Sequence, residues 1–142
     1  MADKIALFDL DRTITVQGTY TPFLLGVAVR RNPLRLILMP LALILMIGYK
    51  AKFYSRDRLK EFMLALLLGR ISRVDLDVHV RRFVTHRLAH GARPGALRQI
   101  EEYRKAGQKL IMATASFDFY ADEFGRQLGF DHVIATQSSW DE

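Results

Sequence analysis

Two aspartates near the N-terminus stand two residues apart at the end of a short apolar run. Asp9 and Asp11 follow the sequence Ile-Ala-Leu-Phe at 5–8, and Thr13 occupies the next alternate position. Two ionised carboxylates this close repel each other, so the pair favours chemistry in which one attacks phosphorus and the other handles a proton. A divalent cation would relieve the repulsion and also neutralise a phosphate. The spacing predicts a phosphoryl-transfer site, and the competing interpretation is an ordinary polar turn after a strand.

Three short apolar runs predict the strands that would position these carboxylates. They cover residues 5–8, 109–113 and 132–135. Continuous apolar runs of this length are typical of central strands that are buried on both faces. The first run ends at Asp9 and the second at Thr114. Both polar residues therefore fall at the carboxyl ends of strands, where parallel sheets bind their ligands.

Helical patterns separate the predicted strands. Residues 94–106 begin with Pro94 and end before Gly107, and residues 117–128 end before Gly129. Proline at the start and glycine just past the end are typical of helices. The order strand, helix, strand, helix, strand predicts an α/β fold with a parallel sheet and right-handed crossovers.

A long helical insertion interrupts this alternation after the first strand. Ser55 is expected to cap a helix that stops at Gly69, and Ser72 with Asp75 forms a plausible capping box for the next helix. We expect the insertion to cover the active edge of the sheet. The predicted domains are a discontinuous core of residues 1–16 and 91–142 and a helical domain of residues 17–90.

The charge is concentrated in the helical insertion. The chain carries a formal net charge of +6, and residues 17–90 hold thirteen Lys and Arg against four Asp and Glu. Such a basic surface suits phosphorylated substrates, acidic lipid or nucleic acid. Nucleic acid is not expected, because the basic residues are not interleaved with a regular set of aromatics. The chain has no cysteine, which excludes disulfides and thiolate metal sites, and no leader pattern, so we expect a cytoplasmic protein.

The loop after the first strand resembles motif I of the haloacid dehalogenase (HAD) superfamily, in which Asp-x-Asp-x-Thr follows a hydrophobic strand. Residues 8–13 carry this resemblance, and residues 110–116 resemble motif II, a strand that ends in Ser or Thr. The insertion matches the position of the family's helical C1-type cap. The resemblance is closest to subfamily IB, which includes phosphoserine phosphatases and phosphatidylglycerophosphate phosphatases. It implies a Rossmann-like parallel sheet with an inserted all-helical cap.

The resemblance also implies a role for each matching residue in a Mg²⁺-dependent phosphomonoester hydrolase. Asp9 would be the nucleophile that forms an aspartyl-phosphate and would also bind Mg²⁺. Asp11 would act as general acid and base and would offer its backbone carbonyl to the metal. Thr13 would support the loop, and Thr114 with the amide of Ala115 would bind the phosphoryl oxygens.

Two neighbouring residues have their own expectations. Arg12 stands where the family often has glycine, and we expect its side chain to point to solvent. Ser116 is expected to be the N-cap of the helix over residues 117–128.

The family's motif III lysine and motif IV acidic pair have no match within the 142 residues. The resemblance therefore implies a core that is incomplete at its C-terminal side, with an apolar edge exposed along the first strand. We expect this chain to be a poor catalyst or inactive. The non-enzymatic alternative is a module that binds phosphorylated ligands without turnover.

An uncharged apolar stretch over residues 36–49 bears on the substrate. The favoured interpretation is a buried cap helix, kinked at Pro40; the alternative is a helix that dips into an anionic membrane surface, with the basic flanks of residues 30–52 on lipid headgroups. Phosphoserine phosphatases carry an acidic residue where this chain has Gly18. That departure argues against phosphoserine as the substrate. The basic insertion and its apolar run resemble the phosphatidylglycerophosphate phosphatases, which implies a lipid phosphate substrate and peripheral contact at the inner face of the membrane. The alternative is a phosphoserine phosphatase-like small-molecule phosphatase.

Overall fold

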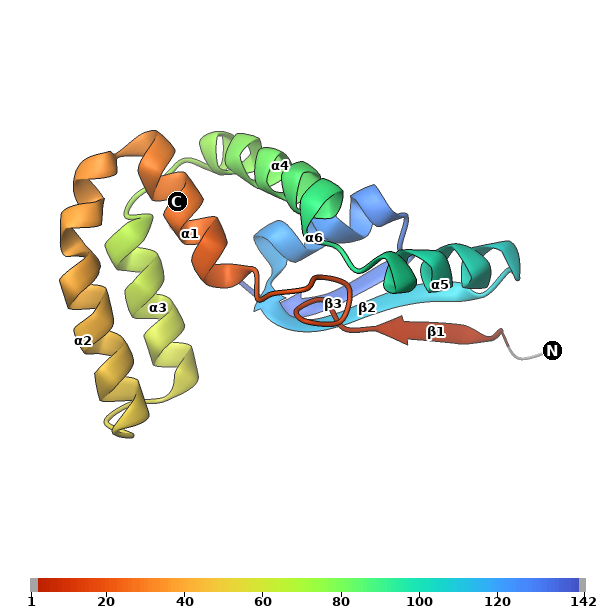
Figure 1. Cartoon of the computed structure of the whole chain (residues 1–142), viewed down its shortest axis with the longest axis horizontal. Coiled ribbons are helices and arrows are strands. Elements are labelled where there is room, and N and C mark those ends of the chain that lie inside the picture. The colour runs from red at the N-terminus through yellow and green to blue at the C-terminus, as the bar shows by residue number, and fades with distance from the viewer. Residues whose placement is uncertain (1–2, 141–142) are drawn as a thin grey trace. The chain divides into compact units, whose positions relative to one another are not determined.

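The computed structural model describes residues 3–140 (Figure 1). The elements in chain order are β1 (Ile5–Phe8), α1 (Tyr20–Arg31), the 3₁₀ helix η1 (Pro33–Leu38), α2 (Met39–Lys50), α3 (Arg56–Leu67), α4 (Arg73–His90), α5 (Pro94–Lys105), β2 (Lys109–Phe117), α6 (Asp118–Leu128) and β3 (His132–Thr136). They form two compact units, which we call the sheet unit (Met1–Thr19 with Asp77–Glu142) and the helical unit (Tyr20–Leu76).

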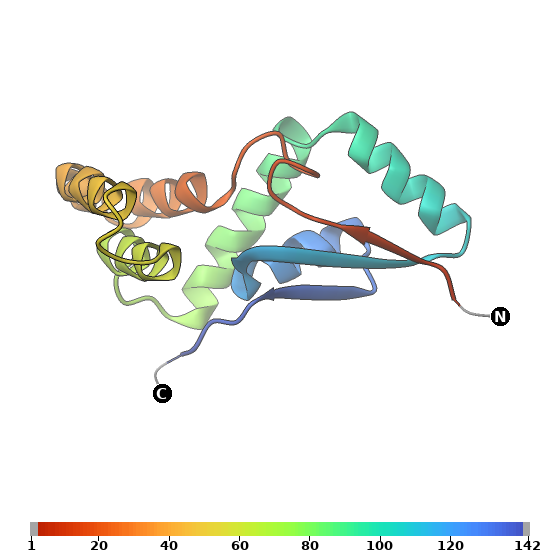
Figure 2. The same cartoon turned by 90° about the horizontal axis from the view of Figure 1, so that it is seen from below.

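The sheet unit contains a parallel three-stranded sheet in the order β1-β2-β3. Helices α5 and α6 lie on the same face of this sheet (Figures 1 and 2). Two right-handed crossovers that step in the same direction require this one-sided arrangement. The predicted α/β fold with a parallel sheet is confirmed.

Strand β1 is buried on one face only, so the prediction of a strand buried on both faces is wrong. Ala6 and Phe8 are buried, whereas Ile5 is 57 % and Leu7 65 % exposed. The reason is that α5 and α6 cover a single face, and nothing in residues 3–140 covers the other. Among these residues β1 pairs with β2 alone, which leaves its second edge unpaired.

A hollow of about 700 Å³ runs along this unpaired edge. It is lined by Leu7, Phe8, Thr13, Val16, Arg93, Pro94, Gly95, Ala96 and Gln99. All of these residues belong to the sheet unit. The two connecting segments beside the hollow are joined by an antiparallel bridge between Thr15 and Ala92.

Strand β2 is longer than the sequence predicts and is irregular near its end. The prediction stops at residue 113, whereas β2 continues to Phe117. Its pairing with β3 is regular up to Ala113 and resumes with Phe117 opposite Thr136, after a shift in register. Bulges of this kind bend a strand and re-aim its side chains, often next to active sites.

The helical unit is built around α3, which contacts both α1 and α2. Its buried side chains include Phe23, Leu24, Met63 and Leu67. The two predicted helix starts are confirmed. The Ser55 hydroxyl oxygen accepts a hydrogen bond from the N–H of Arg58, and Ser72 bonds both the N–H and the carboxylate of Asp75.

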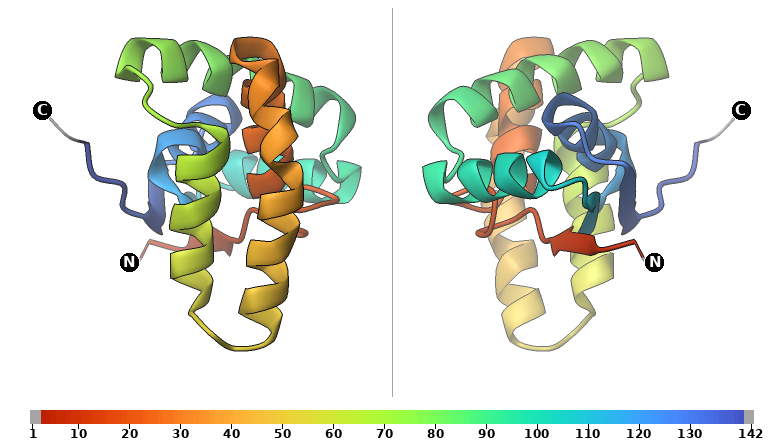
Figure 3. Two further views of the ribbon diagram at one scale, coloured as in Figure 1. Left: turned by 90° about the vertical axis from the view of Figure 1, so that its left-hand side faces the viewer. Right: turned by 90° about the vertical axis from the view of Figure 1, so that its right-hand side faces the viewer.

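Helix α2 contradicts the favoured prediction of a buried helix kinked at Pro40. Within α2 only Ala42 is buried, and most of its large apolar side chains are exposed. The reason is that α2 lies antiparallel to α3 at the side of the unit, so only one narrow face meets a neighbour (Figure 3). Pro40 lies in the first turn of α2, where η1 ends, and not in a helix interior.

The compact units divide the chain differently from the predicted boundaries at 16/17 and 90/91. The helical unit ends at Leu76, inside α4. The remainder of α4 packs in the sheet unit, where Val80 and Val84 are buried. The Gln127 amide of α6 also donates a hydrogen bond of 3.0 Å to the Thr85 hydroxyl. These contacts explain why most of α4 groups with the sheet.

Candidate active site

The predicted site begins in a tight turn directly after β1. The carbonyl oxygen of Leu10 accepts hydrogen bonds from the N–H groups of Ile14 at 3.0 Å and Thr15 at 3.1 Å. The side chain of Asp9 is exposed, and its Oδ1 accepts a hydrogen bond of 2.7 Å from the N–H of Leu10. The turn thus presents the Asp9 carboxylate to solvent at the carboxyl end of the strand, as the sequence predicts.

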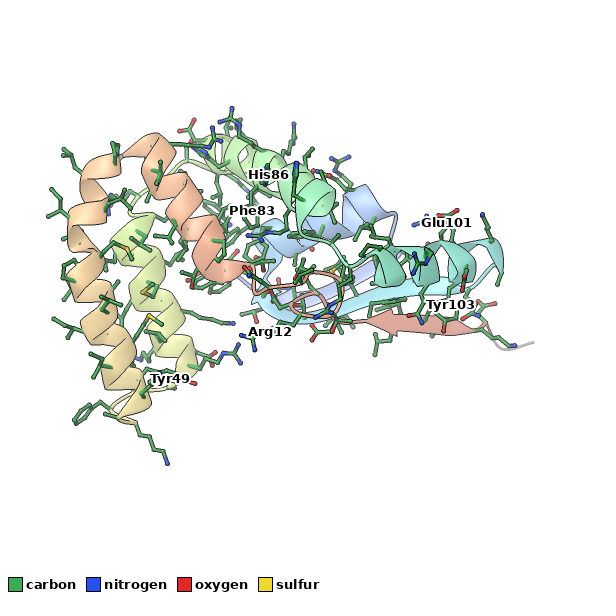
Figure 4. The ribbon with its side chains drawn as sticks, viewed as in Figure 1. Arg12, Tyr49, Phe83, His86, Glu101 and Tyr103 are labelled. Atoms are coloured by element: carbon green, nitrogen blue, oxygen red, sulfur yellow. The ribbon has the colours of Figure 1, made fainter. Side chains whose placement is uncertain are left out.

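Arg12 adopts a left-handed backbone conformation in this turn, with a φ of 61°. Such a conformation is unfavourable for any residue with a Cβ atom and favours glycine. The Arg12 side chain is exposed and extends from the loop (Figure 4), so the predicted solvent orientation is confirmed.

The carboxylate of Asp11 is held by three hydrogen-bond donors. Its Oδ1 accepts from the N–H of Thr19 at 2.8 Å and from the Thr19 hydroxyl at 2.6 Å. Its Oδ2 accepts from the Ser116 hydroxyl. Donors from a loop and from β2 therefore fix the position of Asp11 against the sheet. All of these residues belong to the sheet unit.

The hydroxyl of Tyr120 lies behind this network, 3.2 Å from the Thr19 hydroxyl. Because an ionised carboxylate only accepts, the single hydroxyl hydrogen of Thr19 goes to Asp11 and Tyr120 can donate to Thr19. Burial raises the pKa of Tyr120 to about 12, because it disfavours the charged phenolate. Tyr120 thus stays neutral over the physiological pH range. Its hydroxyl is the contribution of α6 to the hydrogen-bond network around Asp11.

The end of β2 supplies the second predicted group of site residues. The Thr114 hydroxyl accepts a hydrogen bond of 3.1 Å from the N–H of Ser116, and the carbonyl of Ala115 accepts one of 2.9 Å from the Thr136 hydroxyl. Phe8 pairs with Met112 in the register of β1 and β2. Asp9 directly follows this last pair on β1, and Thr114 lies two residues beyond it on β2, so both lie toward the carboxyl ends of the two strands.

Ser116 is not the N-cap that the sequence predicts. The N-cap of α6 is Phe117, without a side-chain capping bond, because β2 continues through Ser116. The Ser116 side chain is buried and bonds Asp11 instead. A clue was available in the sequence, since Ser116 follows Thr114 by two residues and alternate residues of a strand share a face.

Thr15 also stabilises this turn, and the sequence pattern did not predict that role. It is completely buried, and its hydroxyl oxygen lies 3.3 Å from the carbonyl of Leu10 and 2.7 Å from that of Gln17. It also accepts a hydrogen bond from the N–H of Arg12. Thr13, the predicted loop support, is exposed and lines the hollow beside β1.

The oxygen atoms of the turn could supply some, but not all, of the ligands of a hard cation. The Asp9 carboxylate and the Asp11 carbonyl are the ligand types that Mg²⁺ prefers, and Mg²⁺ sites often use one or two carboxylates with waters and substrate phosphate. Residues 3–140 contain no group of three or more Asp, Glu, His or Cys that could hold a metal ion. The turn therefore fits a Mg²⁺ ion that obtains its other ligands from water and a phosphate.

Comparison with known proteins places this arrangement in a family. Residues 6–141 match the haloacid dehalogenase-like hydrolases. The chain belongs to this family, which confirms the resemblance seen in motif I. The phosphatases of this family generally use Mg²⁺.

The relatives are longer than this chain. It is 27 % identical over 133 residues to Protein CicA of Caulobacter vibrioides, which covers 94 % of this chain and 58 % of CicA. A crystal structure of a protein of unknown function from Bordetella pertussis Tohama I matches with a TM-score of 0.81 at 24 % identity, over all of this chain and 64 % of that one.

Solved phosphoserine phosphatases share the fold. A substrate-bound phosphoserine phosphatase complex matches with a TM-score of 0.61 at 15 % identity, over all of this chain and 60 % of that chain. A phospho-aspartyl intermediate analogue of phosphoserine phosphatase matches with a TM-score of 0.58 at 16 % identity. At these identities the likeness extends to the fold, and the substrate has to be argued from the residues of this chain.

Proposed function

We propose that the chain carries the nucleophile of a Mg²⁺-dependent phosphomonoester hydrolase that works through an aspartyl-phosphate intermediate. The observation that carries this proposal is the unequal environment of the two aspartates. Asp9 is exposed at the end of β1, whereas Asp11 is fixed by Thr19 and Ser116. One carboxylate is free to meet a substrate, and the other is held at a defined position beside it. This division of roles is what two neighbouring carboxylates require for acid–base and nucleophilic work.

The proposed reaction has two steps. The first step starts with Asp9 ionised and Asp11 protonated. A carboxylate oxygen of Asp9 attacks phosphorus, the ester P–O bond breaks, and Asp11 gives its proton to the leaving alcohol oxygen. Asp11 then takes a proton from water, whose oxygen attacks phosphorus and releases Asp9 and inorganic phosphate. The Thr114 hydroxyl and the Ala115 N–H would bind phosphoryl oxygens as negative charge develops. Thr13 would support the loop.

The Asp9 carboxylate and the Asp11 backbone carbonyl would hold Mg²⁺ in this proposal. When bound, the ion supplies positive charge that offsets the charge of the phosphate and of Asp9. We further propose that the helical unit is the cap of this site, in the position of the C1-type cap of the family.

The proposed substrate is a phosphorylated small molecule or a lipid phosphate such as phosphatidylglycerophosphate. Gly18 offers no carboxylate to an amino-acid ammonium group, and the helical unit is rich in basic and exposed apolar side chains. Both observations favour the lipid phosphate over a phosphoserine-like substrate. The proposed location is the cytoplasm, at the inner face of the membrane, with peripheral contact through residues 30–52.

A second candidate function is binding of a phosphorylated ligand without turnover. It is favoured by the lack, within residues 3–140, of a third acidic or histidine side chain near Asp9 and Asp11 that could complete a metal site. The two candidates share the phosphate contacts of Asp9, Thr114 and Ala115 and differ in whether the ester bond is broken.

The test measures covalent chemistry and turnover separately. Beryllium fluoride mimics a phosphoryl group on a carboxylate, so ¹⁹F NMR with Mg²⁺ should give bound resonances with the wild-type chain and none with Asp9→Asn. The matched control is Asp122→Asn, an exposed aspartate on α6 that should leave the spectrum unchanged. An Asp9→Asn spectrum identical to wild type would refute the proposed nucleophile. Hydrolysis of p-nitrophenyl phosphate that is lost in Asp9→Asn supports the hydrolase, and bound resonances without hydrolysis support the binding function.

A further inference from the structure

The helical unit exposes a long apolar surface formed by η1 and α2. The helical segment Pro33–Lys50 has a mean hydropathy of 1.6, and only 6 % of it is buried. By length and composition it could cross a membrane. The apolar side chains exposed on it are Leu34, Ile37, Leu38, Leu41, Leu43, Ile44, Met46 and Ile47. Contiguous apolar patches of this kind mark interaction sites, because soluble surfaces rarely carry them.

Five of the exposed side chains follow helical spacing. Leu34, Ile37, Leu41, Ile44 and Ile47 are separated by three or four residues, which places them along one side of the segment. The opposite side faces α3, where Ala42 is buried and the Tyr54 hydroxyl donates to the carbonyl of Leu45. The segment is therefore anchored along one side and apolar along the other.

The charge around this surface is predominantly positive. Residues 20–56 contain no Asp or Glu, and the whole helical unit has ten Lys and Arg against three Asp and Glu, a net of +7. Exposed Arg30 precedes the apolar stripe, and exposed Lys50 and Lys52 follow it. An apolar stripe with basic residues at both ends is the pattern of a helix that lies in an anionic lipid interface.

We propose that η1 and α2 dock in the plane of an anionic phospholipid surface. The apolar stripe enters the boundary between headgroups and acyl chains, and the basic ends contact the lipid phosphates. This inference rests on the proposed function for the nature of the substrate, since docking would bring the enzyme to a lipid phosphate. The docking itself requires neither Asp9 nor turnover.

A membrane-spanning placement of α2 conflicts with the structure of the helical unit. Helix α3 lies antiparallel alongside α2 and carries five charged residues in its first half: Arg56, Asp57, Arg58, Lys60 and Glu61. A spanning α2 would draw these charges into the hydrocarbon, where each is strongly unfavourable. Docking in the plane leaves them at the headgroups or in water.

A second copy of the chain is a poorer occupant of the same surface. Two copies that met through their apolar stripes would bring two segments without acidic residues together. The basic ends would then face one another or solvent with no opposite charge to pair with. An anionic bilayer supplies that opposite charge.

Flotation with lipid vesicles tests the proposal. The wild-type chain should float with phosphatidylcholine vesicles that contain about 30 % phosphatidylglycerol, and far less with phosphatidylcholine alone. Ile44→Asp with Ile47→Asp should lower the bound fraction about tenfold, because these two side chains, 62 % and 66 % exposed, are the most exposed apolar side chains of α2.

The matched control is Val74→Asp with Val78→Asp. These valines of α4 are 75 % and 53 % exposed, so the pair makes the same change of charge at comparably exposed apolar positions outside η1 and α2. The control should retain wild-type flotation. Equal losses in both double variants would overturn the proposal, because charge alone would then explain binding.

A fluorescent probe gives a second measurement that does not depend on charge. The chain contains no cysteine, so a single Cys can be labelled with NBD without altering other residues. With anionic vesicles, NBD at Ile44→Cys should shift to the blue and NBD at Val74→Cys should not. No shift at position 44 would overturn the proposal, as would a dimer in sedimentation experiments without lipid that Ile44→Asp with Ile47→Asp abolishes. These readouts are independent of phosphate chemistry, so failure of docking and failure of the phosphatase proposal can be told apart.

Discussion

The buried network around Asp11 predicts a specific loss of stability for Thr19→Val. Valine keeps the shape of threonine but removes the hydroxyl, which donates to Asp11 at 2.6 Å and lies 3.2 Å from the Tyr120 hydroxyl. Asp11 keeps the Thr19 N–H and Ser116 as donors, so the loss is one hydrogen bond to a carboxylate and one partner of a buried hydroxyl. Such a change lowers the free energy of unfolding by about 2 to 3 kcal/mol.

Urea unfolding followed by circular dichroism measures this change. The control is Thr21→Val, an exposed position two residues along the chain, where we expect a change of less than about 0.5 kcal/mol. A double-mutant cycle with Asp11→Asn should show coupling between Thr19 and Asp11 of about 1 kcal/mol or more. A Thr19→Val variant as stable as wild type, with no coupling to Asp11, would refute the network.

Three further predictions concern Tyr120, Arg12 and Gly125. The pKa of Tyr120 is raised from 10.0 to about 12 in the folded chain. The contribution of Tyr120 to the free energy of unfolding is therefore complete below about pH 10 and falls by about 1.3 kcal/mol from pH 9 to 11. In urea titrations, Tyr120→Phe should lose that part of the pH dependence. Arg12→Gly should raise the free energy of unfolding by about 0.5 to 1 kcal/mol, because glycine relieves the positive φ; an unchanged melting temperature would contradict this. Gly125→Ala should lower the free energy of unfolding by about 1 to 3 kcal/mol, because the added methyl group would overlap the Val133 side chain. The control Gly26→Ala adds a methyl group into open space, so it should be neutral or stabilising by up to about 1 kcal/mol. Equal thermal shifts of these two variants would contradict the overlap.

The sequence predicted the main strands and helices and the edge of the sheet at which the candidate site lies, because both follow from local patterns. Apolar runs located β1 and β2, and glycines marked the ends of α5 and α6. Asp9 and Thr114 lie just beyond the last residue pair of the parallel strands β1 and β2, although β2 itself continues to Phe117. A ligand edge is a property of strand order and direction, and the alternation of strands and helices determines both.

The partners of Asp11 could not be predicted, because they depend on contacts between distant segments. Ser116 and Tyr120 lie more than one hundred residues away from Asp11 or Thr19 along the chain. Local pattern favoured a helix cap for Ser116, and only the extension of β2 shows why its hydroxyl is available to a carboxylate.

Burial was the other property that sequence could not supply. The sequences of β1 and α2 are both strongly apolar, yet half of the residues of β1 and most of those of α2 are exposed among the described residues. An apolar composition shows that burial of a segment would be favourable. It does not show whether the segment is buried in the folded chain, since this depends on which neighbours cover each face.

The pairing of β1 with β2 has a consequence for the order of folding. Ile5 pairs with Lys109 across 104 residues (109 − 5), whereas Ile111 of β2 pairs with His132 of β3 across 21 (132 − 111). Closing the longer loop costs about 1.4 kcal/mol more in chain entropy. We therefore expect β2, α6 and β3 to assemble early and β1 to join late.

Because Asp9 and Asp11 directly follow β1 in the chain, they would reach their positions only when β1 pairs with β2. The candidate site would therefore be the last part of the sheet unit to form. In a refolding experiment, beryllium fluoride binding should then return more slowly than the far-ultraviolet circular dichroism signal. A chain caught between these two events would hold most of its helices and two paired strands, and would have no nucleophile in place.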